Sequence, residues 1–167
     1  MEKRFPHRIF ENDDRCSQVK VDINTMRKDR NNNACRLAEL AMGAVTDNRK
    51  RHDVVEEFML ANDTATVAVE VPVWFWENKI FNFDTGKMGV GICGHIDILQ
   101  LKWREIYVLD FKPEAAKEKE EKVCSQLYLY ARGLSFRTGI PLKRFRCAWF
   151  DENDYFEFEP ARAEVRW

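Results

Sequence analysis

Two apolar, β-branched segments joined by a short polar stretch constrain the fold of this chain most strongly. The first, GHIDIL at 94–99, carries one acid, and the second, IYVLDFK at 106–112, ends in an acid, an aromatic residue and a lysine. Residues 102–105 between them, KWRE, are polar apart from one tryptophan. Two such segments around a short polar connection predict a β-hairpin.

The alternation of side chains along a strand fixes where the polar groups of this hairpin point. Asp110 and Lys112 are two residues apart, so both leave the same face, whereas Phe111 points the other way into the core. If the strands pair antiparallel about a Trp103-Arg104 turn, Asp97 lies opposite Asp110 to within about a residue. The hairpin therefore predicts two carboxylates and a lysine at one end of a sheet.

Converging carboxylates repel each other and lose hydration, so their arrangement is costly unless a cation lies between them. Oxygen ligands favour magnesium, manganese or calcium, which indicates a site for a hard metal ion. The alternative is that Asp97 and Asp110 are ordinary strand-end or turn acids and Lys112 an ordinary surface lysine.

The ordered set of motifs resembles the PD-(D/E)xK nuclease superfamily, and within it the RecB-like exonuclease branch. The resemblance covers about residues 46 to 150 and rests on the following residues: Gly94-x-x-Asp97, Asp110-Phe111-Lys112, the helical Gln126 and Tyr130, and His52 and Glu56 upstream. Some RecB-like nucleases hold an iron-sulfur cluster with one upstream cysteine and three near the C-terminus. The five scattered cysteines of this chain lack that pattern.

The resemblance implies an α/β (α+β) fold with a restriction-endonuclease-like core, in which helices flank a mixed central β-sheet in the order α-β-β-β-α-β. It also implies the cofactor, Mg2+ or Mn2+, and the roles of the site residues. Those expected to be catalytic are Asp97, Asp110, Lys112 and Glu56; those expected to hold metal are His52, Asp97, Asp110 and the carbonyl of Phe111; those expected near the substrate are Gln126 and Tyr130.

The helix that precedes the first long strand supplies two of these residues. His52 and Glu56 are four apart and share a helix face, so both can point to a site at the sheet edge. Glu57 competes with Glu56 for this position because the sequence does not give the rotation of the helix. An exposed His-Glu pair without any site is the remaining alternative.

Periodicity elsewhere predicts the remaining elements. We expect helices from residue 34 to 45, from 48 to 61 and after Pro113; strands at 66–76, 80–83, 145–150 and 155–158; a turn at 77–79; and a short helix near 21–30. Two parts follow from this pattern, an N-terminal arm or cap at 1–33 and a nuclease domain at 34–167.

The charge balance does not by itself indicate a nucleic-acid-binding protein. The net charge of the 167 residues is −1, so any contact with phosphates needs segregated basic patches, for which 27–30, 49–51 and 143–146 are candidates. Neither a membrane-spanning run nor a secretory signal is visible in the sequence, which favours an intracellular protein.

Together these features predict a metal-dependent deoxyribonuclease that hydrolyses phosphodiester bonds, with a RecB-like exonuclease as the expected form. The expected partner is DNA, as single strands or duplex ends, with a second copy of the chain or a separate helicase or recombination protein as further candidates. The alternative is a catalytically inactive nucleic-acid-binding or assembly module on the same fold.

Overall fold

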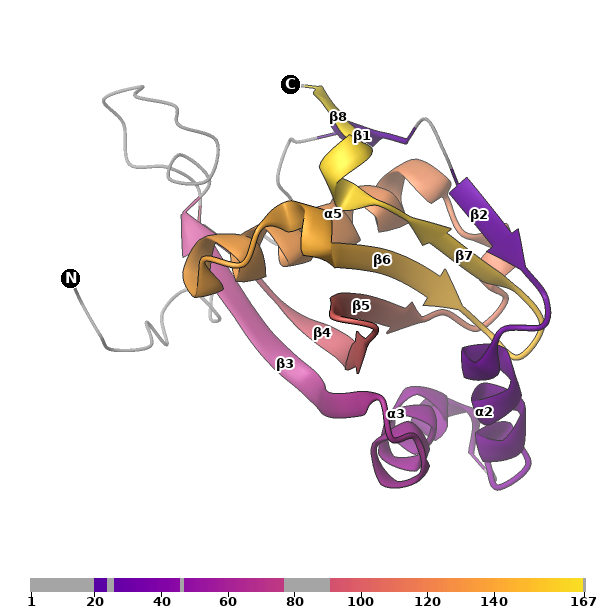
Figure 1. The fold of residues 1–167 in the computed structure, drawn as a ribbon. Coiled ribbons are helices and arrows are strands. Elements are labelled where there is room, and N and C mark those ends of the chain that lie inside the picture. Colours follow the sequence, from indigo (N-terminus) through magenta and orange to yellow (C-terminus); the bar gives the residue numbers. More distant parts are fainter. Residues whose placement is uncertain (1–19, 24–25, 46, 77–90, 167) are drawn as a thin grey trace.

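The computed structural model describes residues 20–23, 26–45, 47–76 and 91–166. Figure 1 shows their arrangement, which combines a central sheet with three α-helices. The principal elements in chain order are β1 (Lys20–Asp22), β2 (Met26–Asp29), α2 (Asn33–Met42), α3 (Arg51–Asn62), β3 (Thr66–Trp76), β4 (Gly91–Lys102), β5 (Glu105–Phe111), α5 (Glu120–Thr138), β6 (Phe145–Phe150), β7 (Tyr155–Phe158) and β8 (Glu164–Arg166).

Six strands form a mixed sheet in the order β2-β7-β6-β5-β4-β3. β5 and β6 are parallel, whereas every other neighbouring pair in this sheet is antiparallel. A parallel pair needs a crossover, and α5 provides it between β5 and β6. The mixed α+β architecture and the predicted order of helices and strands around the hairpin are therefore confirmed.

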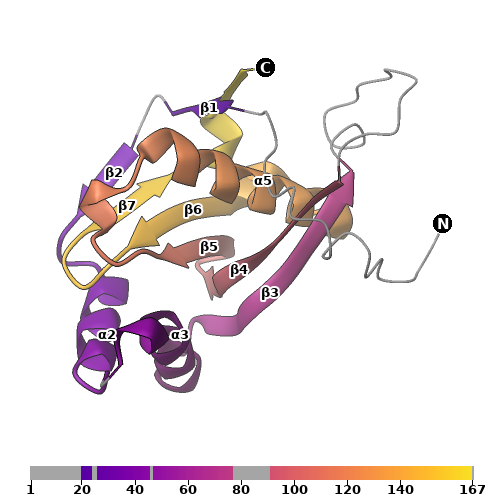
Figure 2. The ribbon, with the colours of Figure 1, turned by 180° about the vertical axis from the view of Figure 1, so that it is seen from behind.

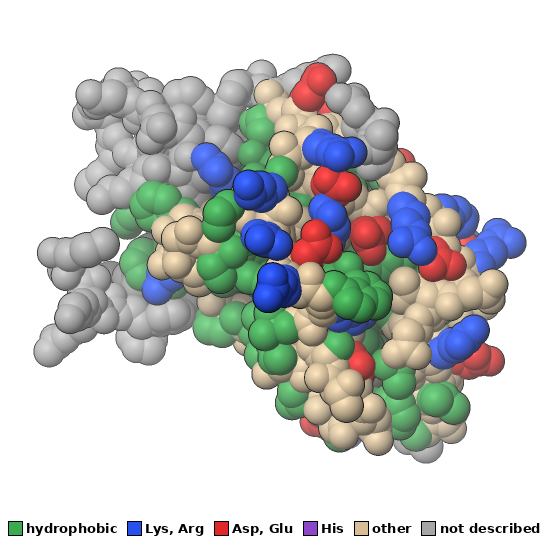
Figure 3. Space-filling model, in the orientation of Figure 1, with side chains coloured by type: hydrophobic (Ala, Val, Ile, Leu, Met, Phe, Trp, Pro, Cys, Tyr) green, Lys and Arg blue, Asp and Glu red, His purple; other side chains and the backbone are tan. Residues whose placement is uncertain are grey.

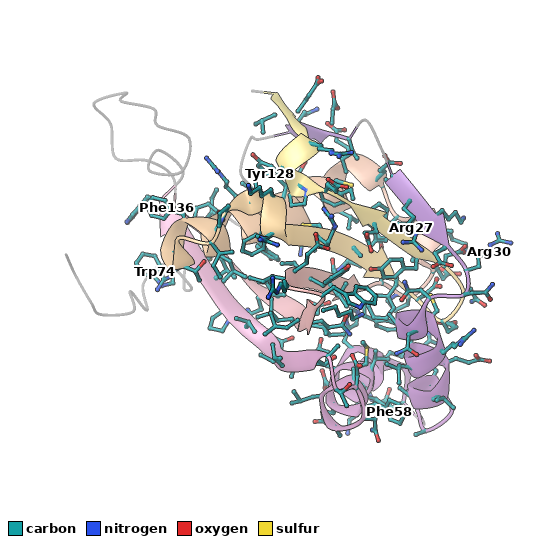
Figure 4. All side chains as sticks on the ribbon, viewed as in Figure 1. Arg27, Arg30, Phe58, Trp74, Tyr128 and Phe136 are labelled. Carbon is teal, nitrogen blue, oxygen red and sulfur yellow. The ribbon has the colours of Figure 1, made fainter. Side chains whose placement is uncertain are left out.

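Helices cover both faces of the sheet, and each face has its own hydrophobic core (Figure 2). The core on the α5 side includes Leu127 and Val108, and the core on the side of α2 and α3 includes Met59 and Leu109. Phe58 of α3 and Tyr128 of α5 accordingly lie on opposite sides of the sheet (Figure 4). Burial on both faces explains why five of the seven residues of β5 are apolar.

The hairpin has the register that the sequence predicts. Ile98 pairs with Leu109 and Lys102 with Glu105, so the next position places Asp97 opposite Asp110. The connection is a two-residue turn in which Trp103 and Arg104 have φ values of 49° and 68°. Positive φ at both central residues is the geometry that matches the twist of antiparallel strands.

In β3 and β4, the side chains that enter each hydrophobic core switch from one face of the sheet to the other at one point. Ile96 and Ile98 are two residues apart in β4, yet one packs in the α5-side core and the other in the α2/α3-side core. Their partners in β3, Val71 and Val69, divide in the same way. Glu70 lies between these partners, opposite Asp97, with a φ of 50°. Asp97 and Glu70 thus lie at the point where β4 and β3 change the face that their side chains present.

The N-terminal part differs from the expectation of a helix near 21–30, which is wrong. β1 pairs with β8, and β2 extends the sheet beside β7, with Met26 opposite Phe158. Val21 is buried in the α5-side core, so long-range packing overrides the weak local preference. The described part of the predicted arm thus pairs with strands of the predicted domain.

The helix expected directly after Pro113 begins only at Glu120. Glu114 has a φ of 63°, which interrupts a regular helix at once. The next residue is tied to β6 and the loop after it, because the Ala115 N–H donates to Asp151 and the Trp149 indole donates to the Ala115 carbonyl. The turn expected at 77–79 and the strand at 80–83 lie outside the described residues.

Within the described ranges, no helix is both long enough and apolar enough to cross a membrane.

Candidate metal centre

The predicted site lies where β4 and β5 stop pairing, close to the N-terminal half of α3. The ligand atoms of His52, Glu56 and Asp97 lie within 4.8 Å of one another. His52 Nδ1 is 3.7 Å from Asp97 Oδ2. The structure therefore brings together two residues of one helix turn and one acid of the hairpin.

The rotation of α3 decides between the two neighbouring glutamates. Val55 and Met59 are fully buried against the sheet, and Glu56, which lies between them, is only 3% exposed. Glu57 is exposed to solvent. Of the two alternatives left open by the sequence, Glu56 is thus the residue that faces the site.

The second strand of the hairpin adds a carboxylate and an ammonium group. Asp110 is 2% exposed, and Lys112 Nζ donates to Asp110 Oδ1 over 2.7 Å. The Phe111 N–H donates to Asp97 Oδ2 over 3.2 Å, which ties the end of β5 to the acid of β4. The Phe111 side chain is fully buried, and the His52 ring meets it edge to face at 5.4 Å. A role for the Phe111 carbonyl as a metal ligand stays a prediction.

Burial and neighbouring side chains shift the pKa values of Glu56, Asp97 and Asp110 in different directions. Burial, followed by the charges of Asp97, Glu70 and Asp53, raises the pKa of Glu56 to about 8. Burial and the neighbouring Asp97 carboxylate also raise the pKa of Asp110. Burial alone would raise the pKa of Asp97, but its interactions with the neighbouring His52 and Asp110 side chains and the charge of Lys112 lower it. The cluster therefore retains protons that isolated carboxylic acids would lose near neutral pH.

Lys112 remains a cation in this environment. Burial lowers its pKa, but the Asp110 carboxylate and the charge of Asp97 outweigh that effect and raise it overall. A charged ammonium group beside a buried carboxylate orients that carboxylate and adds positive potential to the site. The raised pKa keeps this amine protonated near neutral pH.

Two buried carboxylate oxygen atoms indicate that these residues fit a metal ion. Glu56 Oε1 and Asp110 Oδ2 are buried, and neither has a hydrogen-bond partner among the described residues. A buried carboxylate oxygen without a partner is costly, and a divalent cation would satisfy it. The donor set of carboxylate oxygens with one imidazole nitrogen fits Mg2+ or Mn2+, and the imidazole favours Mn2+ of the two.

Gln126 and Tyr130 of α5 share a helix face as predicted, and Gln126 Nε2 donates to Tyr130 Oη over 3.3 Å. The tyrosine lies against β4 at Gly94, where a Cβ atom would approach its ring carbons to 2.7–2.8 Å. The glycine three residues before Asp97 is thus required for the close approach of Tyr130. A role of this pair in binding substrate stays a prediction.

Sequence reasoning missed Glu70, which the structure places next to the site. The charge of its carboxylate raises the pKa of Glu56. A positive φ in a non-glycine strand residue is costly and often occurs at functional sites. The available signal was a single acid in an otherwise apolar strand, TVAVEVPVWFW.

A comparison of the chain with models of known protein families finds no match, and a comparison with curated proteins also finds none.

Proposed function

We propose that this protein is a metal-dependent nuclease that hydrolyses phosphodiester bonds of DNA, with the organisation of the PD-(D/E)xK superfamily and an exonuclease of RecB-like type as its expected form. The observation that supports it most is the pair of buried carboxylate oxygens without partners, Glu56 Oε1 and Asp110 Oδ2. Both belong to one connected group, in which Asp97 links Glu56 and His52 on one side to Asp110 on the other.

The residues proposed to hold a magnesium or manganese ion are His52, Glu56, Asp97 and Asp110. A bound ion supplies a nucleophile by lowering the pKa of its water, and it neutralises the charge that grows on the phosphate. The protein contributes a preformed set of ligands, since the Phe111 N–H fixes Asp97 and Lys112 fixes Asp110. Rigid ligands reduce the reorganisation needed during the reaction.

Lys112 is proposed to act through its charge. Its side chain is 23% exposed, so part of it can reach a phosphate group that enters the site. The raised pKa keeps the ammonium group protonated at neutral pH, which suits stabilisation of a negative transition state better than removal of a proton from water.

The test is a cleavage assay with end-labelled single-stranded DNA, blunt duplex DNA, closed circular DNA and RNA, each in Mg2+, Mn2+ or EDTA. The wild-type protein is compared with Asp110→Asn and with the matched control Glu57→Gln, which alters an exposed acid on the same helix as Glu56. We expect metal-dependent cleavage of DNA by the wild type and the control, and a loss of about 100-fold or more in Asp110→Asn. Cleavage of linear but not circular DNA identifies an exonuclease.

Other outcomes contradict the proposal in distinguishable ways. DNA binding that ignores metal, with no cleavage of any substrate, identifies an inactive binding module on this fold. Failure of Mn2+ to change the melting temperature, with no cleavage, identifies a protein in which the acids have no metal to hold.

A further inference from the structure

The turn between β4 and β5 carries an unusual combination of residues. Trp103 is 85% exposed, and both Trp103 and Arg104 adopt positive φ. Turns of this geometry strongly prefer Asn-Gly, because bulky residues are strained there. Neither the packing of the hairpin nor the geometry of the turn accounts for a tryptophan followed by an arginine. An exposed, strained aromatic residue at the tip of a hairpin suits contact with a ligand.

Cations surround this turn. β5 and β6 are parallel with Ile106 beside Phe145, so the segment that leads into β6, Leu142–Arg144, lies next to the turn. Lys143 and Arg144 are exposed, and neither side chain has an acidic partner within the described part of the chain. Figure 3 shows Lys and Arg side chains gathering over the end of α5 and the segment that leads into β6.

Two acids near this turn, Glu105 and Glu159, are already paired. Glu105 and Glu159 both bind Arg146, and Glu159 also binds Arg162. The side chain of Arg104, like those of Lys143 and Arg144, is left without an acidic partner among the residues that the structure places. Three exposed cations without an ion pair in the described ranges, Arg104, Lys143 and Arg144, therefore lie near Trp103, although the whole chain carries a net charge of −1.

As far as the structure describes the chain, the other two basic stretches have no exposed aromatic side chain of this kind beside them. At 27–30, Arg27 binds Asp29, and both Lys28 and Arg30 bind Asp154. At 49–51, Arg49 binds Asp47, whereas Arg51 donates to the neutral Asn48 and Lys50 has no ion pair among the described residues. The stretch at 143–146 is distinguished by the exposed indole of Trp103 beside its unpaired cations, which makes it the strongest candidate for contact with a single-stranded anionic polymer.

We propose that Trp103, Arg104, Lys143 and Arg144, named here the turn surface, bind single-stranded nucleic acid. A base stacks on the indole, and the cations contact the flanking phosphates, which is how proteins bind single strands without reading their sequence. An acidic protein segment would match the cations but would leave the flat exposed indole without a stacking partner.

The turn surface is separate from the metal centre. Four residues of β5 lie between Glu105 and Asp110, so the two ends of this stretch are about 17 Å apart along the strand. The proposal therefore goes beyond the nuclease proposal and does not depend on it, and the two fail in different assays.

The test measures binding of a labelled oligothymidylate of about 12 nucleotides by fluorescence anisotropy in EDTA, which prevents metal-dependent cleavage. One variant combines Trp103→Asn with Arg104→Gly, which installs the preferred turn and removes both contact groups. We expect this variant to melt about 3 to 6 °C higher than the wild type, because strain is relieved. We also expect it to bind the oligonucleotide about tenfold or more weakly.

A second variant, Lys143→Ala with Arg144→Ala, tests the phosphate contacts. Loss of two contacts should reduce the slope of log affinity against log salt concentration by about 1.4. Glu57→Gln, which changes an exposed acid outside both sites, should bind the oligonucleotide as the wild type does. The turn variant should keep the Mn2+-induced rise in melting temperature, which separates the turn surface from the metal centre.

Quenching of tryptophan fluorescence gives an independent readout. Trp103 is far more exposed than Trp149, which is 2% exposed, so stacking of a base should quench the wild type more than the turn variant. Equal oligonucleotide affinity in the wild type and the turn variant would overturn the proposal. So would a polyglutamate peptide that binds more tightly than the oligonucleotide and displaces it, because that result identifies an acidic protein partner instead.

Discussion

Replacing Glu56 with glutamine removes the most strongly perturbed carboxylate of the metal centre while keeping its size and shape. In the absence of metal, the buried glutamate carries a pKa of about 8, compared with an ordinary value of 4.5. The folded protein therefore holds a proton that the unfolded chain releases between these two pH values. Stability is fully present below pH 4.5 and declines as the pH rises towards 8.

The size of the effect follows from the same two values. One pKa unit corresponds to about 1.4 kcal/mol, so the wild type loses at most about 5 kcal/mol over this pH range. Glutamine avoids that loss, but its amide leaves a buried polar group without a partner, which costs about 1–3 kcal/mol. We expect Glu56→Gln to be about 2 kcal/mol more stable than the wild type at pH 8 without metal, which corresponds to about 4 to 8 °C in melting temperature.

Thermal unfolding at pH 5 and pH 8, in EDTA and in Mn2+, measures both the pH dependence of the stability and the stabilisation by metal. At pH 5 the advantage of the variant should vanish, because the wild-type glutamate is then largely protonated. Saturating Mn2+, at about 100 times its dissociation constant, should stabilise the wild type by about 2.7 kcal/mol and the variant by much less. Glu57→Gln should behave as the wild type throughout. A variant that is less stable than the wild type at pH 8 in EDTA would refute the reasoning.

Three further substitutions test other parts of the site. Lys112→Met should lower turnover by about 100-fold or more and leave Mn2+ affinity within a few-fold of wild type in calorimetry; loss of metal binding in a folded variant would contradict an electrostatic role. Gly94→Ala should cost about 1–3 kcal/mol in urea unfolding because its methyl group meets the Tyr130 ring, and an unchanged midpoint would mean that this approach is not close. Glu70→Gly should raise the stability by about 1 kcal/mol through relief of the positive φ, and should weaken Mn2+ binding if its carboxylate shapes the site; a loss of stability would show that this backbone conformation is not strained.

The hairpin could be predicted from sequence because its signals are local. Alternation with a period of two fixes the faces, and a two-residue connection fixes the register, so the opposition of Asp97 and Asp110 follows from a few residues. The helical spacing of His52 and Glu56 was equally informative. The choice of Glu56 over Glu57 was not available, because the rotation of α3 depends on how Val55 and Met59 pack against the sheet.

Other features depend on contacts between distant parts of the chain. The switch of side-chain faces in β3 occurs at Glu70, whose backbone is left-handed. Glutamate normally avoids this conformation, and no local sequence pattern predicts it. β2 joins the sheet through pairing with β7, more than a hundred residues away, while its own sequence, MRKD, carries no strand pattern. The delay of α5 to Glu120 likewise follows from the hydrogen bonds that hold Ala115 to Asp151 and Trp149.

The most direct test of the central claim is a crystal structure of the protein soaked in Mn2+, with anomalous scattering used to locate the ion. The account predicts an anomalous peak within ligand distance of Asp97 and Asp110, with His52 or Glu56 completing the coordination. A second crystal, of Asp110→Asn, should show a weaker peak or none. No peak at this position at saturating Mn2+, or a peak only at surface acids elsewhere, would contradict the metal centre and the nuclease proposal that rests on it.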